Sequence, residues 1–119
     1  MKIKFSLLLA IIVMQFIGCK PEAQFFWGNY SKTLYAYKKS PSDKTLADHK
    51  KSLTEIISVS LRKRKPVPPG VYAELGFIFE KEGNSKDGMD NFNQEIILYP
   101  ESKEFIEKLE NGFQSGENK

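Results

Sequence analysis

The sequence predicts an all-α fold of about five short helices. Two observations support this class: apolar residues recur three or four positions apart over most of the chain, and proline, glycine and serine separate these stretches where helices start and stop. Consecutive helices joined by short breaks pack as antiparallel hairpins. We therefore expect a short antiparallel helical solenoid, with helices over residues 29–39, 41–62, 71–82, 86–98 and 101–112.

The first residues of the chain carry targeting features and precede this domain. Met1–Lys4 is positively charged, and an apolar run of thirteen residues extends from Phe5 to Ile17. As a helix this run spans about 20 Å, which is short of the roughly 30 Å of a bilayer's hydrocarbon core. Residues 1–18 are therefore predicted to be a signal peptide.

The residues that end the leader are Phe16-Ile17-Gly18-Cys19, and they resemble the bacterial lipobox, with Phe16 where leucine is usual. The resemblance implies cleavage before Cys19, lipidation of its sulfur and amine, and a lipidated tether over residues 19–24. Lys20 follows, and not the aspartate that retains such proteins in the inner membrane, which favours the outer membrane with the domain facing the periplasm. An ordinary secretory cleavage with a free thiol and an uncleaved anchor stay open. Cys19 is the only cysteine, so an intrachain disulfide and a cysteine-rich zinc site are excluded.

Charge is divided unevenly along the mature chain. Residues 20–65 hold 11 Lys/Arg and 4 Asp/Glu, whereas residues 66–119 hold 5 and 11, so the halves carry about +7 and about −6. This asymmetry favours attraction between the halves, orientation over an anionic surface, or a charged partner. Nucleic acid is not expected as a partner of an exported, anchored protein.

Aromatic residues are concentrated just after the tether. Tyr30, Leu34 and Tyr37 follow i, i+4, i+7 spacing, so the helix over residues 29–39 is expected to bury that face. One interpretation is that the aromatics fill the core of a small helical domain; the other is that they form a partner-binding surface. The candidates for such a surface are Trp27, Tyr30, Tyr35 and Tyr37.

The second helix is predicted to start at Ser40-Pro41, with Ser40 as its cap, and to end at Arg62. Its expected buried stripe is Leu46, Leu53, Ile57 and Leu61, with Ile56 beside it. His49 falls on this stripe and is predicted to be a structural residue at the edge of the core. No second histidine, cysteine or Glu-x-x-His spacing accompanies it, so no metal site is predicted, and no cofactor either.

A basic run, Arg62-Lys63-Arg64-Lys65, follows at the end of this helix. Cations at a helix C-terminus are favoured by the helix dipole, so a solvated run is one interpretation. Contact with lipid phosphates or with an acidic partner is the other. The four residues are therefore further candidates for partner binding.

The stretch from Val67 to Ser102 contains two predicted helices on either side of Gly83-Asn84, with Ser85 as a candidate cap for the second. Its spacing of large, small and aromatic residues resembles a tetratricopeptide repeat at Tyr72, Leu75, Gly76, Phe79, Gly88, Phe92 and Pro100. The resemblance implies two antiparallel helices that approach closely at the glycines. Glu95 departs from it, because a small residue is usual there.

One repeat cannot bury both of its faces, so the helices before and after it are expected to complete the solenoid. In the last helix Phe105, Leu109 and Phe113 share a face, with Ile106 adjoining and Gly112 at the end. The helical domain is thus predicted over residues 25–113, with a frayed tail over residues 114–119.

Four segments resemble a family of small bacterial outer-membrane lipoproteins of unknown function: WGNYSKTLYAYKKSPS, LADHKKSLTEII, VPPGVYAELGF and YPES. The resemblance runs from Trp27 to about Leu109. The resemblance implies that members are encoded beside a curli-secretion-channel-like lipoprotein and a second small lipoprotein. The resemblance implies location and shape, and it implies no activity.

The function expected from these features is that of a lipid-anchored adaptor, not an enzyme, binding envelope proteins at the periplasmic side of the outer membrane. A small-molecule or stress-sensing lipoprotein with an apolar pocket is the alternative. A cell-wall or lipid hydrolase using Glu74, Glu80 or His49 is disfavoured, because the two glutamates are six residues apart and lie on different helix faces. The sequence contains no Ser-His-Asp order and no glycine-rich phosphate loop.

Overall fold

The computed structural model describes residues 22–116, so the leader, Cys19 and the last three residues lie outside the described part. Within that part the chain forms five α-helices and one 3-10 turn, without strands. They are α2 (Tyr30–Lys39), α3 (Asp43–Arg62), α4 (Val71–Lys81), α5 (Ser85–Leu98), η1 (Pro100–Ser102) and α6 (Lys103–Ser115). The predicted all-α class is confirmed.

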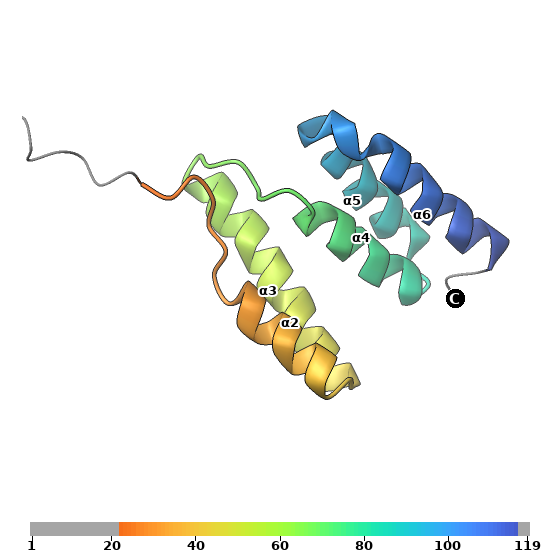
Figure 1. Ribbon diagram of the computed structural model, residues 1–119, viewed down its shortest axis with the longest axis horizontal. Coiled ribbons are helices and arrows are strands. Elements are labelled where there is room, and N and C mark those ends of the chain that lie inside the picture. Colours follow the sequence, from red (N-terminus) through yellow and green to blue (C-terminus); the bar gives the residue numbers. More distant parts are fainter. Residues whose placement is uncertain (1–21, 117–119) are drawn as a thin grey trace, which may run out of the picture.

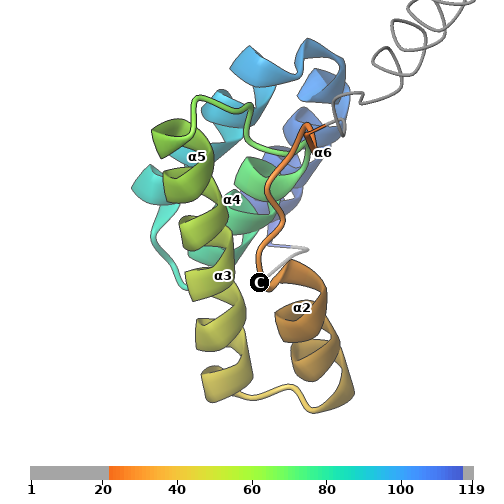
Figure 2. The same cartoon turned by 90° about the vertical axis from the view of Figure 1, so that its left-hand side faces the viewer.

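The helices are arranged as two hairpins and a closing helix (Figures 1 and 2). The first hairpin is α2 with α3, the second is α4 with α5, and α6 packs against both helices of the second. The contact between α3 and α4 joins the two hairpins. The order of packing is therefore that of a short solenoid.

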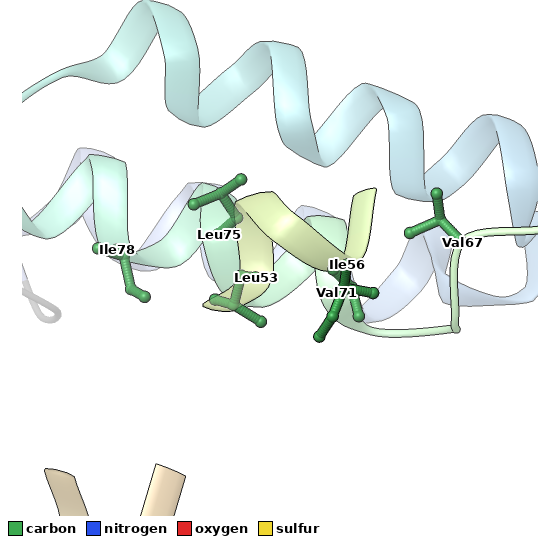
Figure 3. Close-up of a cluster of buried hydrophobic side chains, with 6 residues drawn as sticks. All are labelled: Leu53, Ile56, Val67, Val71, Leu75 and Ile78. Atoms are coloured by element: carbon green, nitrogen blue, oxygen red, sulfur yellow. The ribbon is translucent and has the colours of Figure 1, made fainter. Parts of the chain in front are cut away.

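Two apolar cores meet on α4. The first lies between α3, α4 and the loop between them, and Figure 3 shows its buried members: Leu53, Ile56, Val67, Val71, Leu75 and Ile78. The second lies between α4, α5 and α6 and is made by Ala73, Phe92, Ile106 and Phe113. Because α4 contributes to both cores, it is the central helix of the domain.

The start and the buried face of α3 differ from the sequence prediction. Ser42, and not Ser40, is the N-cap, and its side chain and that of Thr45 form a reciprocal capping box. Leu61 is 63% exposed. Steps of four residues drift around a helix of 3.6 residues per turn, so the predicted stripe leaves the core at its end. Leu53 is buried as predicted, and so are Ile56 beside the stripe and His49 on it; Ser60 is buried at the end of the helix in place of Leu61.

Close approach of α4 and α5 at two glycines was predicted and is confirmed. A Cβ added to Gly76 would lie 2.6 Å from the Phe92 ring and 2.9 Å from the carbonyl oxygen of Gly88. A Cβ on Gly88 would lie 2.6 Å from Oε1 of Glu80. The turn between the helices places Gly83 at φ 78°, and Asn84, not Ser85, caps α5 by accepting from the backbone N–H of Asp87.

Glu95, which departs from the repeat pattern, caps a neighbouring helix. Its side chain is 2% exposed and lies at the N-terminus of α4. Oε1 accepts from the backbone N–H of Gly70 at 2.7 Å, and Oε2 accepts from that of Ala73 at 3.2 Å. These N–H groups have no partner within α4, and a carboxylate is favoured at the positive end of the helix dipole. The position of a small residue is thus taken by a buried ionic cap.

The last helix also differs from its prediction. Phe105 is 57% exposed, whereas Ile106 and Phe113 are buried and Leu109 is partly buried. Gly112 lies inside α6, which continues to Ser115 and ends at Gly116 with φ 82°. Two residues of the predicted tail are therefore helical.

Candidate functional site

A groove of about 370 Å³ separates the first hairpin from α4. The C-terminal half of α2, the first turns of α3 and the exposed face of α4 form its walls. Its lining residues are Leu34, Tyr37, Lys38, Leu46, His49, Glu74, Phe77, Ile78 and Lys81. The predicted candidates Tyr37, His49 and Glu74 are thereby brought together from three helices.

The base of this groove is a hydrogen-bonded chain of four side chains. Nδ1 of His49 lies 2.8 Å from the Thr33 hydroxyl, and Nε2 lies 2.8 Å from Oε1 of Glu74. The Tyr30 hydroxyl donates to Oε2 of Glu74 at 2.8 Å. His49 is 1% exposed, so these hydrogen bonds give both nitrogens of a buried imidazole a partner. They also link α2, α3 and α4. The prediction placed His49 at the core edge as a structural residue; it is buried within the core and hydrogen-bonded.

Glu74 also changes the acidity of Tyr30. Partial burial, the hydrogen bond to Glu74 and the negative charge of Glu74 together raise the pKa of Tyr30 to about 12. Each of these effects disfavours a phenolate next to a carboxylate. Tyr30 therefore stays protonated as a hydrogen-bond donor at any physiological pH.

The order hydroxyl, imidazole, carboxylate is also that of an activated nucleophile. One contact and the burial of His49 distinguish this hydrogen-bonded network from such a relay. The Thr33 hydroxyl also lies 3.1 Å from the carbonyl oxygen of Tyr30, one turn back on its own helix, and the imidazole is enclosed. We infer that the network cross-links the hairpins. Glu80 lies apart from it and accepts a hydrogen bond from Ser85.

Two lysines line the groove beside its apolar side chains. Lys38 on α2 and Lys81 on α4 are both exposed, and neither has an acidic partner within residues 22–116. The Lys81 ammonium lies 5.5 Å from the centre of the Phe77 ring. An apolar group flanked by a negative charge would match this arrangement, because it buries Phe77 and neutralises the cations.

A second hollow of about 330 Å³ lies on the other side of α4, against α6. It is almost wholly apolar and is lined by Gly70, Ala73, Glu74, Phe77, Phe105 and Leu109. Glu74 and Phe77 line both hollows, so a band of accessible surface crosses α4 from α2 to α6. The exposure of Phe105 belongs to this surface.

The aromatic candidates are divided between interior and surface. In α2 no residue is fully buried, and Tyr30, Leu34 and Tyr37 are half-buried. Leu34 and Tyr37 line the groove, whereas Tyr30 packs against the first core. Trp27 is 42% exposed and stacks edge-on against Tyr30 at 5.2 Å. Tyr35 is 65% exposed and faces away from the groove, beneath Lys39 at 5.7 Å from the ring centre. The expected buried face is thus only partly buried.

The basic run lies at the other end of α3. Arg64 adopts φ 55°, and the N–H groups of Arg64 and Lys65 donate to the carbonyls of Leu61 and Ser60, which is the Schellman geometry. Lys65 pairs with Glu22 at 2.8 Å, and this hydrogen bond and charge lower the pKa of Glu22. The run and the groove are therefore separate surfaces.

Pattern reasoning missed four lining residues, Lys38, Phe77, Ile78 and Lys81, and the hydroxyl of Thr33. Lys38 and Leu34 are four residues apart on one helix face, so part of the α2 wall was readable from spacing. The pairing of His49 with Glu74 joins residues on different hairpins, and no local pattern indicates it.

Among residues 22–116 no group of histidine, cysteine or acidic side chains is arranged to hold a metal ion. No helix in that part of the chain is long and apolar enough to cross a membrane. The predictions for Cys19 and for residues 1–18 lie outside the described residues.

The chain belongs to the family described as "Domain of unknown function (DUF4810)", whose model matches residues 25–109. The match covers well over half of the chain and almost the same stretch as the predicted resemblance to a family of unknown function. Searches of curated proteins and of solved structures found no match. The family thus assigns no activity, and function has to be argued from the surfaces.

Proposed function

We propose that the protein is a lipid-anchored adaptor that binds a segment of an envelope protein in the groove between α2 and α4. The observation that carries the proposal is the groove itself, in which apolar side chains are accessible and two lysines lack acidic partners among the described residues. Within the monomer these two cations form no ion pair, whereas a partner segment with an apolar group and a negative charge would cover Phe77 and neutralise both lysines.

The proposed location follows from the lipobox. A lipid on Cys19 would hold the domain at the outer membrane, on the periplasmic side, where lipoproteins and secretion channels are assembled. The tetratricopeptide-like spacing supports a binding role, because stacked helix hairpins expose one continuous face. The resemblance to gene neighbours of a curli-secretion-channel-like lipoprotein suggests that the partner belongs to such a complex.

A charge-reversal pair tests the groove. Lys38→Glu with Lys81→Glu reverses both groove charges at exposed positions and leaves the cores intact. The matched control is Lys44→Glu with Lys86→Glu, whose side chains are each 83% exposed and lie outside the groove. Affinity purification of the intact lipoprotein from detergent-solubilised envelopes measures recovery of a partner, with Cys19→Ala as the unanchored reference.

We expect the control to retain the partner and the groove variant to lose most of it, at least tenfold for two removed attractions of about 1 kcal/mol each. Equal recovery by both variants would exclude the groove. Recovery of no envelope protein above the Cys19→Ala reference would count against an adaptor altogether. Stabilisation of the pure protein by one class of metabolite in a thermal-shift screen would favour the small-molecule alternative.

A further inference from the structure

We propose that the C-terminal end of α3 is a membrane-contact surface, on which Arg62, Lys63 and Arg64 bind the phosphates of anionic lipid headgroups. The inference rests on the lipid anchor of the proposed function. It adds to that function which end of the domain meets the bilayer, and therefore which way the groove faces.

The three side chains form a concentrated positive charge. All are exposed, and within the part of the chain that the structure describes none of them forms an ion pair. Lys65 differs, because it is only 18% exposed and pairs with Glu22. The end of α3 therefore presents three cations on one turn of chain that form no ion pair with a described residue. The charge of Lys63 helps to lower the pKa of Glu22, and its ammonium lies 5.5 Å from the centre of the Phe26 ring. Basic clusters of this kind are attracted to anionic lipid within a Debye length, about 8 Å at physiological salt.

The path of the chain brings the anchor to the same place. Besides its ion pair with Glu22, Lys65 donates to the carbonyl oxygen of Ala23 at 2.9 Å. Figure 1 shows the described chain starting, in orange, beside this end of α3. Cys19 precedes Glu22 by only three residues, a span of at most about 10 Å. A lipid on Cys19 therefore holds the basic end of α3 near the headgroups.

An exposed apolar side chain lies next to the cations. Leu61 is 63% exposed, although its neighbours Val59 and Ser60 are buried. A leucine beside three cations can enter the boundary between headgroups and acyl chains while the cations stay at the phosphates. Insertion at this boundary would explain why Leu61 is exposed, which the helix pattern did not predict.

The same geometry turns the groove away from the membrane. His49, at the base of the groove, precedes Arg62 by thirteen residues of one helix, which is about 20 Å along α3. Contact through the end of α3 would therefore present the groove to the periplasm. This is the orientation that an adaptor needs.

Lysine labelling on vesicles tests the inference. The mature, lipidated protein is added to preformed vesicles of phosphatidylcholine alone, or with about a third of the lipid as phosphatidylglycerol. A membrane-impermeant amine reagent then labels it, and mass spectrometry gives the rate at each lysine. Lys63 reports the basic end, while Lys38 and Lys81 report the groove.

We expect phosphatidylglycerol to slow labelling of Lys63 at least fivefold and to leave Lys38 and Lys81 within about twofold, since each cation near the surface changes the docked ratio about fivefold. Arg62→Gln with Arg64→Gln should abolish most of the protection, as should about 0.5 M NaCl. Lys86→Gln with Lys108→Gln, which removes two exposed cations elsewhere, should retain it.

The outcomes separate this inference from the proposed function. A protein that floats with both kinds of vesicle, but whose Lys63 is labelled equally on each, is anchored without using the basic end, and the inference is overturned. Protection of Lys38 and Lys81 in place of Lys63 overturns it as well, because the groove would then face the bilayer. Failure to float with phosphatidylcholine vesicles contradicts the lipid anchor itself.

Discussion

Glu95→Gln tests whether one buried carboxylate holds the second hairpin in place. Glu95 is 2% exposed, and its two oxygens accept from the N–H groups of Gly70 and Ala73 at the start of α4. Glutamine has nearly the same shape, but only one of its two terminal atoms can accept. The variant therefore loses one charge-assisted hydrogen bond, leaves one buried N–H group facing an amide NH₂, and removes the charge from the helix N-terminus.

The expected loss follows from these contacts. A hydrogen bond to a charged group contributes about 1.5–3 kcal/mol, and a buried donor left without a partner costs about 1–3 kcal/mol. Because the two figures describe the same lost contact, we expect Glu95→Gln to lower the unfolding free energy by about 2–3 kcal/mol. Glu95→Ala leaves both N–H groups unpaired and should lower it by about 4 kcal/mol. For a small domain this is a large fraction of its stability.

Urea unfolding at pH 7, followed by circular dichroism, measures these losses. The control is Glu104→Gln, since Glu104 is an exposed carboxylate paired with Lys108 one turn away, and its loss should be below about 0.5 kcal/mol. A second readout reports the charge itself. Burial raises the pKa of Tyr72 and that of Tyr99, and the charge of Glu95 raises both further.

In Glu95→Gln both of these tyrosine pKa values should therefore fall, as followed by NMR titration. The reasoning would be refuted by a Glu95→Gln protein whose stability lies within about 0.5 kcal/mol of the wild type. Unchanged pKa values of Tyr72 and Tyr99 would show that the carboxylate is not ionised where the structure has it.

Three further predictions concern packing, backbone and network. Gly76→Ala should lower the unfolding free energy by about 2 kcal/mol, because its Cβ would lie 2.6 Å from a buried phenylalanine ring. The atoms nearest a Cβ on Gly88 belong to the side chain of Glu80, which can move, so Gly88→Ala should change the unfolding free energy by less than about 1 kcal/mol; urea unfolding measures both. Arg64→Gly should raise it by about 1 kcal/mol, since Arg64 has φ 55°, and a higher midpoint of thermal unfolding would show this. Tyr30→Phe should lower it by about 1 kcal/mol at pH 7 by removing the bond to Glu74. The pKa of Tyr30 in the folded state, about 12, exceeds its ordinary value of 10.0. The contribution of Tyr30 to the unfolding free energy is therefore complete below pH 10 and is lost as the pH rises toward 12. When the unfolding free energy is measured against pH, Tyr30→Phe should lack that alkaline loss.

Each of these predictions has a contrary result. Equal losses for the two glycine variants would mean that the helices can separate slightly at Gly76. A lower thermal midpoint for Arg64→Gly would mean that the arginine side chain contributes more than its backbone strain removes. An alkaline loss of stability that persists in Tyr30→Phe would assign the titration to another group.

The elements of this fold are largely predictable from local sequence, and their ends less so. Apolar spacing located the five helices that lie within residues 22–116, and Gly76 and Gly88 indicated the close pair because only glycine leaves room there. Boundaries failed where several capping residues compete: Ser42 caps α3 in place of Ser40, because Thr45 completes a capping box with it.

The faces of the helices were harder to predict than their positions. Leu61 and Phe105 fit an apolar stripe in sequence, yet both are exposed because they lie on the side of their helix that faces away from the core, while Ser60 and Ile106 beside them are buried. Glu95 shows the opposite error. The repeat pattern calls for a small residue at this packed position, so a charge there reads as a mismatch. In the structure the carboxylate of Glu95 accepts hydrogen bonds from backbone N–H groups at a helix N-terminus, 22 and 25 residues away in sequence.

The groove depends on contacts between the two hairpins, and local sequence patterns do not predict such contacts. His49 and Glu74 were each singled out in the sequence. The distance of 2.8 Å between Nε2 of His49 and Oε1 of Glu74 follows only from how the two hairpins pack. The basic run was recognisable from sequence alone. Its place beside the first described residues of the chain follows from the bonds that Lys65 makes to Glu22 and Ala23.

Photo-crosslinking in living cells tests most directly whether the groove between α2 and α4 binds an envelope partner. A photoreactive residue placed at Tyr37 or at Lys81 lies in the groove, and one placed at Lys86 lies on an exposed surface outside it. The proposal predicts that the two groove positions capture the same envelope protein, that Lys86 does not, and that Lys38→Glu weakens capture from Tyr37. Capture of the same proteins from all three positions, or of none from the groove, would contradict it.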